Sequence, residues 1–177
     1  MNVCVTVQAE AEERETRDRP VMEHVTLVKS VAHRLAHRMT VAALRALRVE
    51  WKIGVVTNGM PDVQARKVTA LGLEPLVDCV VYANAYGSGA GKPDREPFLE
   101  ALRRLDVTPD RAVFVGDDDY CDVFGASRVG MRTVLAATWN MRPRGRPVRA
   151  DTVVVRLRDV PRIAERLVDA RWRDHVA

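Results

Sequence analysis

The sequence AVFVGDDDYCDVFGA, residues 112–126, joins a short apolar run to a cluster of carboxylates. Residues 112–115 are wholly apolar, which is typical of a strand buried on both faces of a parallel sheet. Gly116 ends this run, and four acidic residues follow within six positions: Asp117, Asp118, Asp119 and Asp122. Carboxylates crowded at the end of a buried strand repel one another unless a cation lies among them. Hard oxygen ligands suit Mg²⁺, so we favour a metal or ligand site over the alternative, a solvated acidic turn.

Other apolar runs alternate with helical patterns along the chain. The predicted strands cover residues 52–57, 79–82, 112–115, 133–135 and 152–155. Strands that alternate with helices at this spacing predict an α/β fold. We therefore expect a three-layer α/β/α sandwich around a doubly wound, mostly parallel, Rossmann-like sheet.

The length of 177 residues corresponds to one domain with a sizeable core. We assign residues 41–177 to this core domain. Residues 1–40 form a separate N-terminal segment, either a vestigial cap or a lead-in. Within it, residues 2–7 predict a strand, and apolar residues that recur every four positions predict a helix over residues 21–39.

Composition and charge argue against several classes of function. The net charge of +4 is modest, and no aromatic residue interleaves with the cluster of arginines at 142–149, so we expect no nucleic-acid partner. No segment approaches the ~18 apolar residues of a membrane span, and the N-terminus lacks a signal-peptide pattern. We therefore expect a cytoplasmic protein with no membrane partner. The three cysteines are widely spaced, which argues against a zinc site or a disulfide framework.

Three predicted strand ends carry groups suited to phosphoryl chemistry. Thr57, Asn58 and Gly59 follow one strand and offer a hydroxyl, an amide and backbone N–H groups. Lys92 follows a glycine-rich loop and supplies a positive charge, while the acidic cluster after residue 116 can hold Mg²⁺. Each motif alone is common in turns and helix starts. Phosphoryl transfer needs positioning and charge stabilisation of this kind, so their common placement at strand ends predicts a phosphate site.

These motifs resemble those of the haloacid dehalogenase (HAD) superfamily. VVTNG (55–59) is similar to its second motif, GKPDREPF (91–98) to its third, and VFVGDDDYCDVFGA (113–126) to its fourth, of the form GDxxxxD. The resemblance covers about residues 41–158.

The resemblance implies a role for each matching residue. Thr57 would bind the phosphoryl group with help from Asn58, and Lys92 would hold phosphate and nucleophile together. Asp117 would ligate Mg²⁺, the implied cofactor, and Asp122 would support the metal site.

The first motif of the family, DxDxT, is absent from the 177 residues. Its first Asp is the nucleophile, at the end of a central strand that lies between the strands of the second and fourth motifs. Val3–Val7 is the upstream candidate for this strand, which would put Gln8 near the nucleophile position and Glu10 near that of the acid/base. The alternative is an N-terminus unrelated to that strand. A glutamine cannot form an acyl phosphate, so we expect impaired catalysis.

Two functions follow from the resemblance. The first is a HAD-like phosphohydrolase-family protein with a Mg²⁺-dependent phosphate site, impaired in phosphoester hydrolysis. The alternative is a non-catalytic regulatory or interaction protein that binds phosphate and Mg²⁺ on the same scaffold. The expected partner is a phosphorylated small molecule. A sheet that lacks its central strand could also recruit one from a second copy, so a homo-oligomer is possible.

Overall fold

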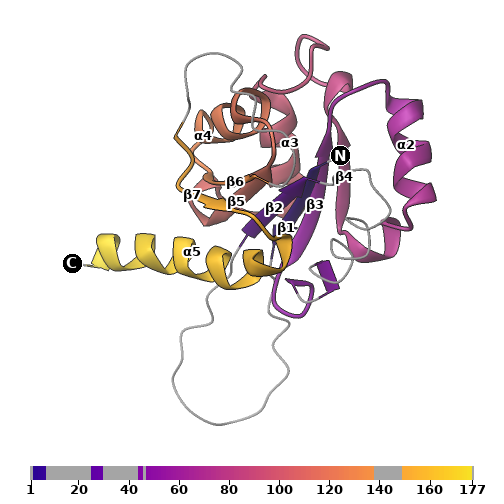
Figure 1. Ribbon diagram of the computed structural model, residues 1–177. Coiled ribbons are helices and arrows are strands. Elements are labelled where there is room, and N and C mark those ends of the chain that lie inside the picture. The colour runs from indigo at the N-terminus through magenta and orange to yellow at the C-terminus, as the bar shows by residue number, and fades with distance from the viewer. Residues whose placement is uncertain (1, 7–24, 30–43, 46, 138–148, 177) are drawn as a thin grey trace.

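The computed structural model describes residues 2–6, 25–29, 44–45, 47–137 and 149–176 (Figure 1). Seven strands form one sheet in the order β4-β3-β1-β2-β5-β6-β7. Their bounds are β1 Asn2–Thr6, β2 Val25–Lys29, β3 Lys52–Thr57, β4 Cys79–Tyr82, β5 Ala112–Gly116, β6 Arg132–Ala136 and β7 Thr152–Val154. The five strands predicted downstream of residue 50 are confirmed, with small differences at their ends.

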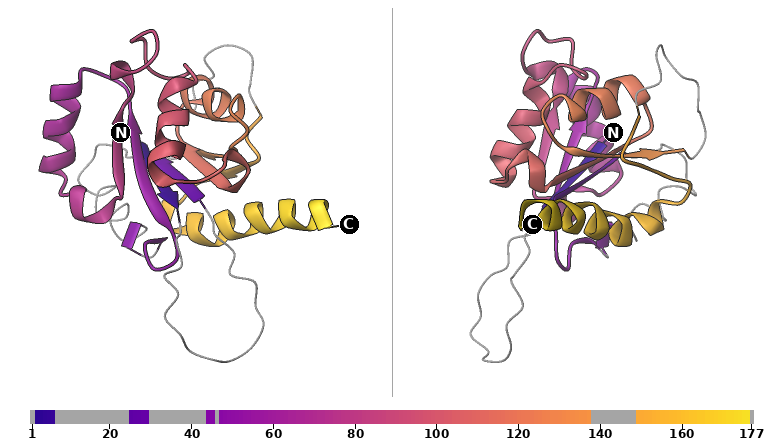
Figure 2. Two further views of the ribbon diagram at one scale, coloured as in Figure 1. Left: turned by 180° about the vertical axis from the view of Figure 1, so that it is seen from behind. Right: turned by 90° about the vertical axis from the view of Figure 1, so that its left-hand side faces the viewer.

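Helices cover both faces of the sheet, which confirms the three-layer α/β/α sandwich (Figure 2). Their bounds are α2 Pro61–Ala70, α3 Glu96–Leu105, α4 Gly125–Ser127 and α5 Val160–Val176. One core cluster joins α2 and α5 to the sheet through residues such as Val68, Val160 and Val113. The other joins α3 and α4 to the opposite face through residues such as Phe98 and Phe114. No helix within the described ranges is long and apolar enough to span a lipid bilayer.

Strand β5 lies at the centre of this packing, and all five of its residues are buried. On the α3 face, the rings of Phe98 and Phe114 meet edge to face with centroids 5.0 Å apart. A Cβ added to Gly125 would lie 2.6 Å from the ring of Phe98. The lack of a side chain at Gly125 therefore lets the segment after β5 pack this close to α3.

Strand β1 is antiparallel to both of its neighbours, and the other described strands run parallel to one another. In the register with β3, Asn2 pairs with Val56 and Thr6 pairs with Lys52. The amino end of β1 therefore lies at the edge where β3 ends, and its carboxyl end lies at the opposite edge. The expectation that Val3–Val7 brings its carboxyl end to Thr57 is wrong. Gln8 and Glu10 lie outside the described residues.

The helix predicted over residues 21–39 is wrong for residues 25–29, which form β2; the rest of that range lies outside the described residues. Val25, Thr26 and Val28 are β-branched and favour a strand, and β2 pairs with both β1 and β5. Two strands therefore fill the gap for which one was expected. Since the sheet is continuous within one chain, the reason for recruiting a strand from a second copy no longer applies.

Helix α3 carries a small ion-pair cluster on its surface. Glu100 accepts hydrogen bonds from Arg103 at 2.8 and 2.9 Å and from Arg104 at 2.7 Å. These bonds lower the pKa of the Glu100 carboxyl to about 2. The pKa is below the ordinary carboxyl value of 4.5, so the contribution of Glu100 to stability is complete above that pH and is lost as the pH falls towards 2.

We expect Glu100→Gln to lower the free energy of unfolding at neutral pH by less than about 1 kcal/mol, because both arginines are solvent-exposed and water screens the pairs. The difference from wild type should shrink as the pH falls below 4.5. Urea unfolding of both proteins at neutral pH and near pH 3 measures this difference. A difference that stayed constant on acidification would contradict the assignment.

Candidate active site

A buried ion pair at the carboxyl edge of the sheet forms the centre of the candidate site. The Nζ of Lys92 donates hydrogen bonds to Oδ1 of Asp122 at 2.8 Å and to the carbonyl oxygen of Val56 at 3.2 Å. Both side chains are almost completely buried, at 3% and 0% exposure. The ring of Phe114 lies 5.6 Å below the ammonium. Lys92 therefore connects the end of β3 to the segment that follows β5.

The backbone around Asp122 is built for this contact. A Cβ added to Gly116 would lie 2.3 Å from the Cβ of Asp122, so the last position of β5 accepts no side chain. The second oxygen of Asp122 accepts a hydrogen bond from the N–H of Asp118 at 3.1 Å. Residues 119–124 form a π-helical turn, whose first N–H groups, on Tyr120 and Cys121, donate to the side chain of Asp118. Such turns are frequent at functional sites.

The hydroxyl of Thr57, at the end of β3, is buried. It donates a hydrogen bond to Oε1 of Gln64 at 3.1 Å. Sequence reasoning missed Gln64. A signal was available, because Gln64 lies four residues before the buried Val68 on α2 and so shares the face of that helix that packs on the sheet.

Two asparagine side chains organise the loops at this edge. Asn58 bonds both backbone groups of Lys92: its Oδ1 accepts from the N–H at 2.8 Å and its Nδ2 donates to the carbonyl at 3.0 Å. Asn84, in the turn after β4, accepts from the N–H of Gly59 at 2.6 Å and donates to the carbonyl of Gly89 at 2.8 Å. Sequence reasoning missed Asn84, although its place directly after a strand was the available signal.

The structure puts Thr57, Lys92 and Asp117 at one edge of the sheet, because β3 and β5 run in the same direction. It brings Lys92 together with Asp122 and Asn58. Thr57 and Asp117 lie farther apart than the single intervening strand of the expectation would place them, because β1 and β2 both lie between β3 and β5. With two strands between them, β3 and β5 are about 14 Å apart; with one strand between them, the distance would be about 10 Å.

The carboxylates after β5 are largely engaged in hydrogen bonds with neighbouring groups. The described part of the chain contains no cluster of three or more His, Cys, Asp or Glu side chains with the geometry to hold a metal ion. Each oxygen of Asp122 already accepts a hydrogen bond, from Lys92 and from the Asp118 N–H. The Oδ1 of Asp118 accepts the first N–H groups of the π-helical turn.

Cys121, after β5, and Cys79, at the start of β4, have thiols that are poor nucleophiles. Burial raises the pKa of the Cys121 thiol, and the nearby Asp118 and Asp122 raise it further. Burial raises the pKa of Cys79 to about 12. Because the thiolate is the nucleophilic form, neither side chain favours attack at neutral pH.

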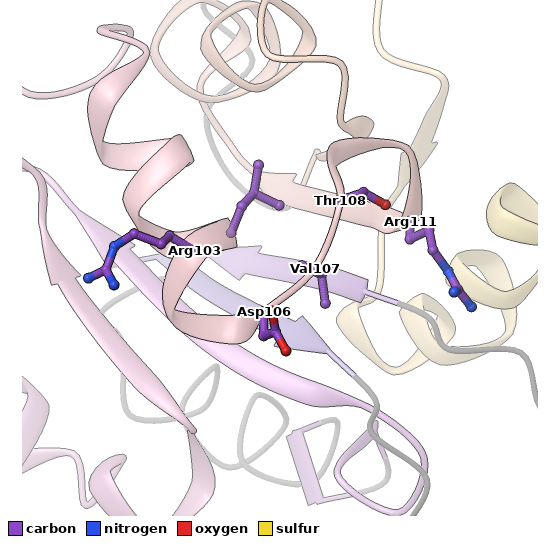
Figure 3. Close-up of a pocket in the computed structure, with 6 residues that line it drawn as sticks. Arg103, Asp106, Val107, Thr108 and Arg111 are labelled. Atoms are coloured by element: carbon purple, nitrogen blue, oxygen red, sulfur yellow. The ribbon is translucent and has the colours of Figure 1, made fainter.

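A separate pocket of about 370 Å³ lies at the amino edge of the sheet, between the end of α3 and the start of β5 (Figure 3). Its lining residues are Leu102, Arg103, Asp106, Val107, Thr108 and Arg111. Figure 3 shows the guanidinium groups of Arg103 and Arg111 pointing away from each other. The pocket therefore lacks converging charges and is distinct from the site around Lys92.

Comparison with known proteins gives consistent matches. A profile of the haloacid dehalogenase-like hydrolase family matches residues 6–130. A glyceraldehyde 3-phosphate phosphatase of Methanopyrus kandleri is 42% identical over 84 residues, which are 48% of this chain and 35% of that protein. A phosphoserine phosphatase of Thermus thermophilus is 35% identical over 108 residues, which are 61% of this chain and 42% of that protein. The chain thus spans less than half the length of these curated relatives.

A solved structure has the same fold. The crystal structure of a HAD phosphatase from Thermococcus onnurineus matches with a TM-score of 0.60 and 34% identity, over 70% of this chain and 55% of that chain. The family profile covers Thr57, Lys92 and Asp117 and more than half of the sequence. The chain therefore belongs to the haloacid dehalogenase-like hydrolase family.

Proposed function

We propose that the carboxyl edge of the sheet binds the phosphoryl group of a phosphorylated small molecule. The observation that carries this proposal is the buried ammonium of Lys92, held between Asp122 and the carbonyl of Val56. In the proposal, Lys92 neutralises a phosphoryl oxygen, and Thr57 and Asn58 donate hydrogen bonds to the others, while the N–H of Gly59 stays bonded to Asn84. Thr57 would exchange its hydrogen bond to Gln64 for one to the ligand. In the ligand-free protein the bond to Gln64 keeps the buried hydroxyl paired.

Hydrolysis by this chain is impaired in our proposal. An aspartyl-phosphate mechanism needs a carboxylate that attacks phosphorus, and the sequence contains no DxDxT motif. Lys92 and Thr57 would still stabilise charge on a bound phosphoryl group. Binding and electrostatics without the nucleophile leave a residual rate of about 10³–10⁴ over water in stripped hydrolase triads.

In the proposal, Mg²⁺ binds weakly to the carboxylate of Asp117. Asp122 supports this site indirectly, through its ion pair with Lys92. Few carboxylates are offered there, and Mg²⁺ then keeps most of its water. The relatives named for glyceraldehyde 3-phosphate and phosphoserine favour a small phosphomonoester as the ligand of this chain.

A second candidate is a non-catalytic protein that uses the same pocket to sense or hold a phosphorylated molecule. The same absence of a nucleophile motif favours it. The two candidates differ only in turnover, so one experiment separates them.

The test measures p-nitrophenyl phosphate turnover with and without Mg²⁺, together with orthophosphate binding by calorimetry. We expect binding, with turnover no more than about 10⁴-fold above the uncatalysed rate. The matched control is the neutral-pair variant, Lys92→Met/Asp122→Asn, which removes both charges of the ion pair together. It should bind orthophosphate more weakly and show no residual turnover. Robust turnover by the wild type that is lost in the neutral-pair variant would contradict the proposal of an impaired enzyme. Absence of orthophosphate binding by the wild type would contradict the proposed phosphate site.

A further inference from the structure

The glycine-rich loop of residues 87–91 directly precedes Lys92 and contains no helix or strand. Gly87, Gly89 and Gly91 have φ values of +59°, +81° and +78°, which residues with side chains rarely adopt. One backbone hydrogen bond, from the N–H of Gly89 to the carbonyl of Tyr86, spans 3.1 Å within the loop. Glycines leave the chain many alternative conformations, so the position of Lys92 depends on contacts from outside the loop.

Asn84 provides such contacts on both sides. Its Oδ1 accepts the N–H of Gly59, in the turn after β3, at 2.6 Å. Its Nδ2 donates to the carbonyl of Gly89, in the glycine-rich loop, at 2.8 Å. Because one partner is a donor and the other an acceptor, only one orientation of the amide satisfies both. The side chain therefore joins the two loops directly.

The close packing at Gly91 couples this contact to Lys92. A Cβ on Gly91 would lie 2.8 Å from the Oδ1 of Asn58 and 2.9 Å from the Oδ1 of Asn84. Two amide oxygens thus flank the residue that precedes Lys92. Asn58 then holds the backbone of Lys92 itself. A shift of Asn84 would be transmitted through Gly91 and Asn58 to the lysine.

We infer that Asn84 is a positioning residue for the phosphate site. It fixes the turn at Gly59 against the loop at Gly89, so that the ammonium of Lys92 and the N–H groups after β3 keep one mutual geometry. The inference rests on the proposed function, because it assigns Asn84 a role in binding at that same site. Asn84 acts through Gly59 and Gly89 rather than on the phosphoryl group.

The first test compares orthophosphate affinities by calorimetry. Asn84→Ala removes the hydrogen bonds to Gly59 and to Gly89. We expect about 10-fold weaker binding of orthophosphate, the equivalent of one to two neutral hydrogen bonds. Ser88→Ala is the matched control, because the Ser88 hydroxyl bonds to Asp94 and to the N–H of Ala90, and neither bond reaches the turn after β3. It should change the affinity less than about twofold, since the hydrogen bonds of Asn84 to Gly59 and Gly89 stay intact. Equal affinity of Asn84→Ala and wild type would overturn the inference.

A double-mutant cycle separates positioning from general loosening of the fold. In the background of the neutral-pair variant, Asn84→Ala should weaken orthophosphate binding by less than about threefold, because the charge that Asn84 positions is gone. Losses of equal size in both backgrounds would overturn the inference. Amide hydrogen exchange of the ligand-free protein should be faster at Gly59 and over residues 87–91 in Asn84→Ala, and unchanged exchange would likewise count against it.

The proposed function and this inference fail in different ways. If the wild-type chain does not bind orthophosphate, the proposed function is wrong. If wild type binds and Asn84→Ala binds equally well, the phosphate site stands and the role of Asn84 is wrong.

Discussion

Asp122→Ala should lower the free energy of unfolding by about 3–5 kcal/mol, because it takes the carboxylate of Asp122 away from the buried ammonium of Lys92. The Lys92 side chain is only 3% exposed, and the carbonyl of Val56, which accepts from its Nζ at 3.2 Å, is uncharged. The alanine would also remove the acceptor of the Asp118 N–H. Urea unfolding followed by far-UV circular dichroism measures the loss.

Two controls give the value a meaning. Arg156 and Asp159 form an ion pair at 3.3 Å whose side chains are 59% and 35% exposed, so Asp159→Ala should cost less than about 1 kcal/mol. The neutral-pair variant should recover most of the loss, since the penalty comes from an unpaired charge rather than from the absence of a salt bridge. If Asp122→Ala were as mild as Asp159→Ala, the buried pair would not be a stabilising feature of the fold.

Removal of the Lys92 charge should raise the dissociation constant for orthophosphate by about 30-fold or more, since truncation of one buried, hydrogen-bonded charge costs about 2–5 kcal/mol of binding. The neutral-pair variant is the form to use, because it avoids an unpaired Asp122. Calorimetry at low ionic strength measures the affinity, with circular dichroism to verify that the protein is folded.

Lys67→Met is the control for overall charge, because the neutral-pair variant removes one positive and one negative charge and leaves the net charge unchanged. Lys67 lies on the exposed side of α2, and its removal lowers the net charge by one without touching the carboxyl edge of the sheet. Its dissociation constant should stay within about twofold of wild type, because charges exposed to solvent are screened. If Lys67→Met weakened binding as much as the neutral-pair variant does, orthophosphate would respond to a charge far from the site as strongly as to the buried pair, which would contradict a built site.

The downstream fold was predictable because its strands are apolar on both faces and end in glycine or polar turns. Residues 52–57 and 112–116 are of this kind, and the structure has strands at both places. The N-terminal strands were harder to predict. The segment around Leu27 carries a four-residue apolar repeat, which mimics a helix, and its assignment as β2 depends on pairing with residues more than eighty positions away.

The candidate site was predictable in the residues that belong to motifs, the neutral Thr57 and Asn58 as well as the charged Lys92 and Asp122, but not in Gln64 and Asn84. Lys92 and Asp122 carry a charge that must be paired when buried, so a motif containing them indicates a site. Gln64 and Asn84 are ordinary polar residues in sequence. Their importance comes from partners supplied by other elements, Thr57 for one and Gly59 with Gly89 for the other. Such partners follow from tertiary packing, which local patterns do not encode.

The antiparallel strand β1 and its partner β2 have a consequence for how the chain is assembled during synthesis. The outer edge of β2 pairs with β5, with Val25 opposite Ala112. On a ribosome Ala112 is made roughly 90 residues after Val25, a delay of ~4–18 s. Until then one side of this early pair offers unsatisfied backbone N–H and carbonyl groups to any other strand. We therefore expect the nascent chain, rather than the finished protein, to be the form that most needs a chaperone.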